Sequence, residues 1–123
     1  MPTYQDPGYV YVASNPSYNC VKIGYTTNHP EYRLSLMNKH VAVPTPFVIE
    51  CAYYVQNSRR VEGLIHRRLK DCQVGKEFYD VKPQKVADIL KYEFGGVDWQ
   101  EHMAEKNRPA VDSLADILGK IAF

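Results

Sequence analysis

The chain has 123 residues, enough for one domain with its own hydrophobic core and too few for two. Hydrophobic residues make up 45% and charged residues 24%, as in soluble globular proteins, and no apolar run approaches the roughly 20 residues of a membrane span. The N-terminus lacks the basic-then-apolar pattern of a secretion signal, so we expect a cytoplasmic protein.

Cysteine spacing and charge distribution further limit the functions that this protein can have. Cys20, Cys51 and Cys72 are odd in number and far apart, which is typical of reduced cysteines without a metal or catalytic role. Residues 1–76 contain nine Lys or Arg and five Asp or Glu, a balance of +4, whereas residues 77–123 contain six and nine, a balance of −3. The basic first part suits a polyanionic partner.

The first predicted element is a β-hairpin with strands at residues 9–13 and 20–25, joined by a turn-rich loop. Because side chains alternate between the faces of a strand, Tyr9 and Tyr11 share one face and leave the other to valines. Lys22 and Gly24 share a face of the second strand. One face of this hairpin therefore carries phenol and ammonium groups and a bare glycine backbone, which folding alone would not require.

A helix and a strand follow the hairpin. Pro30, placed after two polar residues, predicts a helix from about residue 30 to residue 40 that carries Arg33. Residues 47–55 are rich in β-branched and aromatic side chains and predict a strand. Their near-continuous apolar character predicts that this strand is central and covered on both faces.

A second helix is predicted from residue 59 to about residue 72. Glu62 and His66 are i, i+4 neighbours on a face distinct from its apolar stripe. Basic side chains surround this pair and form either a solvated face of the helix or a set of phosphate contacts: Arg59, Arg60, Arg67, Arg68 and Lys70.

The remaining elements are a short edge strand at residues 77–81, a third helix from 83 to about 94, and a last amphipathic helix around 110–121. The two glycines at 95 and 96 stop the third helix. We therefore expect a domain at residues 1–94 and a C-terminal helical extension at 95–123. The extension either packs on the domain or joins two copies into a homodimer.

This order of elements resembles the GIY-YIG nuclease superfamily, and within it the phage-type branch whose second motif reads K-I-G. The resemblance covers about residues 8–90 and rests on the stretches 8–12, 21–26, 44–47 and 77–78, on Arg33, and on the Glu62 and His66 pair. Eleven residues separate Tyr11 from Lys22, and eleven more separate Lys22 from Arg33.

The resemblance implies an α+β fold, with a small three-stranded antiparallel sheet flanked by helices, and hydrolysis of a DNA phosphodiester with one divalent metal, Mg²⁺ or Mn²⁺. By position, the tyrosine of the first motif falls on Tyr11, the helix arginine on Arg33 and the metal-binding glutamate on Glu62. Two positions depart from the family pattern. Lys22 replaces the tyrosine of the second motif, as in the phage-type branch, and Tyr9 occupies the glycine position of the first.

The chemistry of these side chains fits that reaction. Glu62 offers a hard oxygen ligand, and Mg²⁺ is often held by one or two carboxylates with several waters retained. Arg33 presents a planar fork of donors suited to phosphate oxygens. Tyr11 would orient or deprotonate a water, with Lys22 as the cation that assists a phenol in that role. His66 would carry a proton or contact phosphate, and Tyr9 would join the basic helix in binding nucleic acid.

The same residues also have plain structural interpretations. Tyr11 is then a half-buried strand tyrosine, Lys22 a solvated edge lysine and Arg33 a surface residue of its helix. Glu62 and His66 are then a helix-surface pair, worth only a few tenths of a kcal/mol.

Three functions compete. The leading hypothesis is a metal-dependent DNA endonuclease with weak sequence specificity, and it requires Tyr11, Arg33 and Glu62 to meet in one cleft. The second is a nucleic-acid-binding module that keeps the fold without efficient catalysis. The third is a phage- or defence-related interaction protein that uses its acidic C-terminal part to dimerise or to contact a partner.

Overall fold

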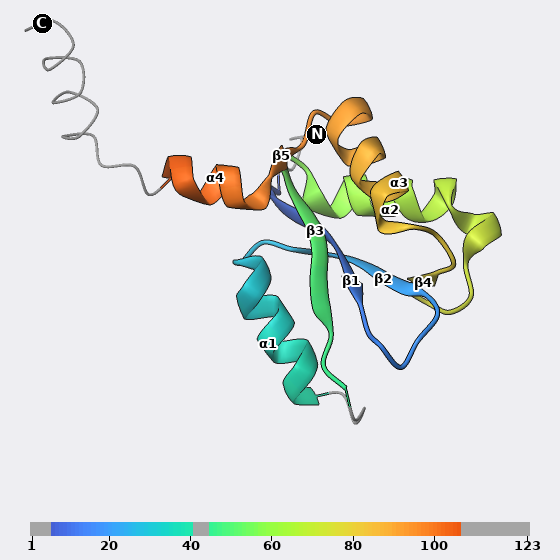
Figure 1. Ribbon diagram of the computed structural model, residues 1–123. Coiled ribbons are helices and arrows are strands. Elements are labelled where there is room, and N and C mark those ends of the chain that lie inside the picture. The colour runs from blue at the N-terminus through green and yellow to red at the C-terminus, as the bar shows by residue number, and fades with distance from the viewer. Residues whose placement is uncertain (1–5, 41–44, 107–123) are drawn as a thin grey trace, which may run out of the picture.

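The computed structural model describes residues 6–40 and 45–106 and has an α+β fold built on one antiparallel sheet (Figure 1). Its elements in chain order are β1 (Gly8–Ser14), β2 (Val21–Thr26), α1 (Pro30–His40), β3 (Val48–Val55), α2 (Ser58–Arg68), a 3-10 turn (Lys70–Cys72), β4 (Phe78–Tyr79), α3 (Pro83–Asp88), a π-helical turn (Ile89–Glu93), β5 (Val97–Asp98) and α4 (Trp99–Lys106).

The sheet has five strands in the order β4-β2-β1-β3-β5, and each neighbouring pair is antiparallel. The three long strands, β1, β2 and β3, are those that the sequence predicts. The expectation of three strands is too low, because β4 extends the β2 edge and β5 extends the β3 edge. β4 confirms the short edge strand predicted within residues 77–81. β5 has only two residues, so it is too short to show the alternation of apolar and polar residues by which a strand is predicted from sequence.

β3 is not the central strand that its apolar sequence predicts. β1 lies in the centre, and all its residues up to Ala13 are buried, whereas the first four residues of β3 are partly or fully exposed. An apolar run indicates that a strand is buried. It does not indicate which strands pair with it in the sheet, because those strands come from distant parts of the chain. Only the short β5 covers the outer edge of β3.

Helices cover both faces of the sheet (Figure 1). On one face Val10 and Val12 of β1 pack with the apolar stripes of α2 and α3. On the other face Tyr11 packs with Met37 of α1, and Trp99 of α4 lies against the same cluster. The predicted division of the β1 side chains between two faces is confirmed, but the tyrosine face is also buried, because α1 and α4 close over it.

The helix boundaries follow local signals. α1 begins at Pro30 as predicted, and Nδ1 of His29 accepts a hydrogen bond from the Glu31 N–H at 3.1 Å. α3 and the π-helical turn together span most of the predicted helix from 83 to 94. The chain then leaves at Gly95, whose φ of +63° lies in the left-handed region that glycine adopts without a Cβ penalty.

Residues just beyond the predicted boundary at 94 contact the sheet. The Gly96 N–H donates to the Leu90 carbonyl at 2.8 Å, β5 pairs with β3, and α4 follows without a break. The sequence did not predict α4. The predicted helix around 110–121, and with it the homodimer contact, lies outside the described residues. None of the helices in the described part of the chain is long and apolar enough to cross a membrane.

Candidate functional site

A cleft of about 290 Å³ opens where the β1–β2 hairpin, α1 and α2 meet. Tyr11, Arg33 and Glu62 all line it, as the leading hypothesis requires, although they come from three different elements. The other lining residues are Gly24, Tyr25, Thr26, Thr27 and Glu77. The sequence pointed to Glu77 only as part of the 77–78 stretch that carries the resemblance, and the structure places it in the cleft, just before the edge strand β4.

Tyr11 reaches the cleft by lying across Gly24. The two residues are directly paired between β1 and β2, and a Cβ built at Gly24 would lie 2.4 Å from the Tyr11 hydroxyl oxygen. Only glycine leaves room for the ring in this position. Tyr11 is 1% exposed, and its hydroxyl donates to Sδ of Met37 at 3.8 Å. The tyrosine is therefore fully packed, and its oxygen is held at the inner wall of the cleft.

Arg33 lies beside that hydroxyl. Hydrogen bonding with Tyr11 raises the pKa of Arg33 above its already high ordinary value, while burial opposes the rise. Its Nε is buried and has no hydrogen-bond partner among the described residues. A buried donor without a partner costs free energy unless an acceptor arrives. Phosphate is a suitable acceptor because the guanidinium fork matches its oxygens.

Glu62 is held in a setting that disfavours its charge. Burial raises the pKa of its carboxyl above the ordinary 4.5, the His66 imidazole opposes that rise, and the Glu77 carboxylate adds to it. His66 does not line the cleft. Its Nε2 donates to the Ile23 carbonyl at 3.0 Å, so its Nδ1 faces Oε1 of Glu62 at a distance of 4.0 Å. His66 is thus placed to act on Glu62 rather than on a substrate.

Lys22 forms an ion pair with Glu77 and does not line the cleft. Burial raises the pKa of Glu77, but the Lys22 ammonium outweighs it and leaves the pKa below its ordinary value. Glu77 therefore stays ionised more readily than Glu62. The cation beside the Tyr11 hydroxyl is Arg33, not Lys22 as the sequence suggested.

The predicted nucleic-acid contacts separate into three groups. Arg59, Arg60 and Arg67 line a hollow on the outer side of α2, whereas Arg68 forms an ion pair with Glu93. Lys70 is exposed in the 3-10 turn and lines no hollow described here.

Tyr9 does not offer a free surface. It is 4% exposed, its hydroxyl lies 2.7 Å from Nδ1 of His102 in α4, and its ring packs edge-on against Tyr54. The prediction for Tyr9 is corrected because α4, which the sequence did not predict, covers it.

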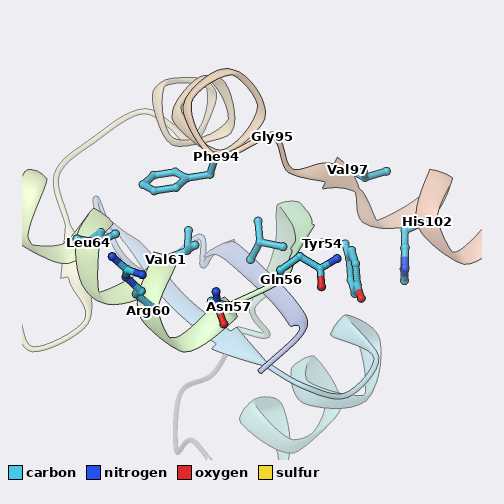
Figure 2. Close-up of a pocket in the computed structure, with 11 residues that line it drawn as sticks. Tyr54, Gln56, Asn57, Arg60, Val61, Leu64, Phe94, Gly95, Val97 and His102 are labelled. Atoms are coloured by element: carbon cyan, nitrogen blue, oxygen red, sulfur yellow. The ribbon is translucent and has the colours of Figure 1, made fainter. Parts of the chain in front are cut away.

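Another hollow, of about 470 Å³, lies between the end of β3, α2, the segment after α3 and α4 (Figure 2). Its walls are mainly apolar, with Val61, Leu64 and Phe94 on one part and Arg60 and His102 on opposite sides (Figure 2). Apart from Arg60, no residue that the sequence predicts for function lines it.

A family model described as the T5orf172 domain matches residues 8–92. This stretch runs from β1 into the π-helical turn and contains every residue of the cleft. The chain belongs to the T5orf172 domain family. β5 and α4 lie just beyond the matched stretch of the T5orf172 domain.

The T5orf172 domain of this chain is also similar to a curated relative from Invertebrate iridescent virus 6, the putative KilA-N domain-containing protein 315L. The two are 36% identical over 88 residues, which cover 68% of this chain and 37% of the relative. The chain thus spans little more than a third of that relative's length. No solved structure matches the chain.

Proposed function

We propose that this T5orf172 domain is a metal-dependent endonuclease that hydrolyses phosphodiester bonds of DNA. The observation that carries the proposal is the meeting of Tyr11, Arg33 and Glu62 in one cleft. Tyr11 and Glu62 lie 51 positions apart along the chain, and the three residues come from a strand and two helices. They are three of the four positions that the resemblance to GIY-YIG nucleases points to; the fourth, Lys22, does not line the cleft.

The acidic side of the cleft fits a divalent cation. Glu62 and Glu77 both line it, and burial disfavours the ionised form of each carboxylate. A bound cation would offset this cost of burial. No group of three His, Cys, Asp or Glu residues gathers within residues 6–40 and 45–106. Mg²⁺ does not need one, since it commonly keeps several waters and uses one or two carboxylates. When bound, such an ion would polarise a phosphoryl oxygen and stabilise the leaving oxygen.

The chain's own groups supply the rest of the chemistry. Arg33, with its unpartnered Nε, would bind a non-bridging phosphate oxygen and stabilise the charge that builds on it. The Tyr11 oxygen, fixed between Met37 and Arg33, would orient the attacking water. His66 would act as a positioning residue that fixes the Glu62 carboxylate. Lys22 would act in the same way on Glu77.

A second candidate is a nucleic-acid-binding module that cleaves poorly or not at all. Two observations favour it. Tyr11 is almost fully buried, which limits the access of water to its hydroxyl, and Lys22 is engaged by Glu77 rather than free in the cleft.

Cleavage of supercoiled plasmid, single-stranded DNA and branched DNA with Mg²⁺ or Mn²⁺ tests both candidates. Tyr11→Phe and Glu62→Gln should each abolish cleavage of whichever substrate is cut. Tyr9→Phe is the matched control, because Tyr9 shares the strand, the face and the burial of Tyr11 but lies outside the cleft. Cleavage that survives both cleft variants would overturn the nuclease proposal. Binding of DNA without cleavage under either metal would establish the second candidate.

A further inference from the structure

The outer side of α2 carries a basic hollow of about 600 Å³, lined by Asp6, Asn57, Arg59, Arg60, Gly63 and Arg67. Arg59, Gly63 and Arg67 follow one another at four-residue spacing and therefore lie along one face of the helix. All three arginines are exposed. This arginine hollow shares no lining residue with the cleft, and it shares Asn57 and Arg60 with the apolar hollow in Figure 2.

The arginine hollow adjoins the cleft across α2. Glu62 lines the cleft and its neighbour Gly63 lines the hollow, so the two sites lie on adjoining sides of one helical turn. From Arg59 to Arg67 the helix rises by roughly 12 Å, which leaves room for more than one phosphate of a nucleic-acid strand. A strand that enters the cleft can therefore continue along this face of α2.

The charges in the hollow are available to a ligand. Arg59, Arg60 and Arg67 form no ion pair with any residue in the described ranges, in contrast to Arg68, which is paired with Glu93. Asp6 contributes the one carboxylate of the lining, and its main-chain oxygen accepts from the N–H and the hydroxyl of Ser58 at 2.9 Å each. Three guanidinium groups against one carboxylate leave an excess of positive charge.

The floor of the hollow at Gly63 faces open space, since a Cβ built there would meet no atom within 4 Å apart from its chain neighbours and the backbone of α2. Without a side chain at this position, an anion can rest against the helix between Arg59 and Arg67. The first turn of α2 adds positive partial charge, since it carries no acidic residue and no side chain caps it.

We propose that the arginine hollow holds the sugar–phosphate backbone that flanks the scissile phosphate, with Arg59 and Arg67 as its principal contacts. This inference rests on the proposed function, because it takes the strand in the hollow to be the one that enters the cleft. It also divides the basic residues of α2 into those that bind, Arg59 and Arg67, and one that does not, Arg68.

The test is binding of a labelled DNA duplex to the full chain, followed by fluorescence anisotropy in EDTA so that no cleavage takes place. Arg59→Ala and Arg67→Ala should each weaken binding by roughly tenfold near 0.1 M salt and reduce the salt slope by about one. Arg68→Ala, which removes the same charge from the same helix, should leave affinity within about twofold.

Two further variants separate a built hollow from general attraction to a basic surface. Gly63→Leu fills the floor with an uncharged side chain that suits a helix better than glycine, and it should weaken binding without a change of charge. Asp6→Asn removes the opposing carboxylate and should tighten binding. Thermal melts of each variant confirm that it folds.

Equal losses in Arg59→Ala and Arg68→Ala, or unchanged binding in Gly63→Leu, would overturn the inference. The outcome is separable from that of the proposed function. If cleavage needs Glu62 while the hollow variants bind normally, only the hollow assignment fails. If binding follows the hollow but no metal supports cleavage, the nuclease proposal fails, and the hollow is a DNA-backbone site without a scissile phosphate beside it.

Discussion

Glu62 is the residue at which stability and proposed function oppose each other. Its carboxylate is buried beside Glu77, so its folded-state pKa is raised above the ordinary 4.5. A raised pKa means that the ionised carboxylate is less favourable in the folded chain than in the unfolded chain. The associated stabilisation is fully present below the unfolded-state pKa and is lost as pH rises through the folded-state pKa.

Glu62→Gln should therefore raise the melting temperature at pH 7, and the gain should shrink toward pH 4, where wild-type Glu62 becomes protonated. The same variant should lose metal-dependent cleavage. Thermal melts across this pH range give the measurement, with Glu31→Gln, at an exposed glutamate, as the control. A lower melting temperature at pH 7 would mean that Glu62 stabilises the fold as an ion, contrary to this account.

Gly24 is the residue that decides whether Tyr11 fits. Gly24→Ala should destabilise the fold by about 1 to 3 kcal/mol, because its methyl group would overlap the Tyr11 ring and force it to shift. Urea unfolding measures the difference. Gly75→Ala is the matched control, since a Cβ there would meet the Phe78 side chain only at ordinary contact distances of 3.5 to 3.9 Å. A neutral Gly24→Ala would show that Tyr11 moves without cost.

At the scale of the element, α2 borders both the cleft and the arginine hollow, and its glycine lowers its helix propensity. Gly63 lies in the middle of the helix, where glycine is less stabilising than a residue with a side chain such as alanine. Gly63→Ala should therefore stabilise the fold by about 0.5 to 1 kcal/mol, because nothing lies within 4 Å of the added methyl group. Urea unfolding again provides the measurement. A loss of stability in Gly63→Ala would mean that the added methyl group clashes with a neighbour, contrary to the open space that the structure shows there.

The environment of His102 in α4 favours the neutral form of its imidazole. His102 stacks on Tyr54 at 3.7 Å, and burial lowers its pKa below the ordinary 6.5, with Lys106 adding to the effect and Glu105 opposing it. A lowered histidine pKa contributes stability above the unfolded-state value, and that stability is lost as pH falls through the folded-state pKa. The contact of α4 with the sheet should thus weaken below about pH 6.5.

Trp99, the single tryptophan of the chain, reports on this change because it begins α4 and packs near His29. We expect its fluorescence to shift on acidification before the sheet unfolds, and His102→Gln should remove that early shift. An unchanged Trp99 signal down to the global unfolding transition would show that His102 does not control the docking of α4.

At the scale of the whole molecule, the proposed function predicts recognition of the DNA backbone rather than of bases. Phosphate neutralisation supplies most non-specific affinity, and a domain of this size has few side chains to spare for base edges. Cleavage of one long duplex should therefore yield many positions without a shared sequence. Mapping the cut ends measures this, and one sharp site would contradict it.

Local signals in the sequence were enough to predict much of the fold. Pro30 predicted the start of α1, the two glycines predicted the stop after the third helix, and alternation in residues 9–13 placed valines and tyrosines on opposite faces. The strand order was not predictable, because the apolar run in β3 does not reveal that β1 lies between β2 and β3. α4 was missed because its sequence is polar and its packing depends on single contacts from Trp99 and His102.

By itself, the sequence determined most of the main elements, because residue type, spacing and periodicity are local properties. The resemblance to GIY-YIG nucleases implied the α+β class and pointed to Tyr11, Arg33 and Glu62, which line one cleft in the structure. Only the tertiary structure decided which groups meet. It brought Glu77 into the cleft, paired Lys22 with Glu77, buried Tyr9 under α4 and divided the arginines of α2. The physical reason is that burial and charge pairing are set by segments far apart in the chain, and no pattern within one segment encodes them.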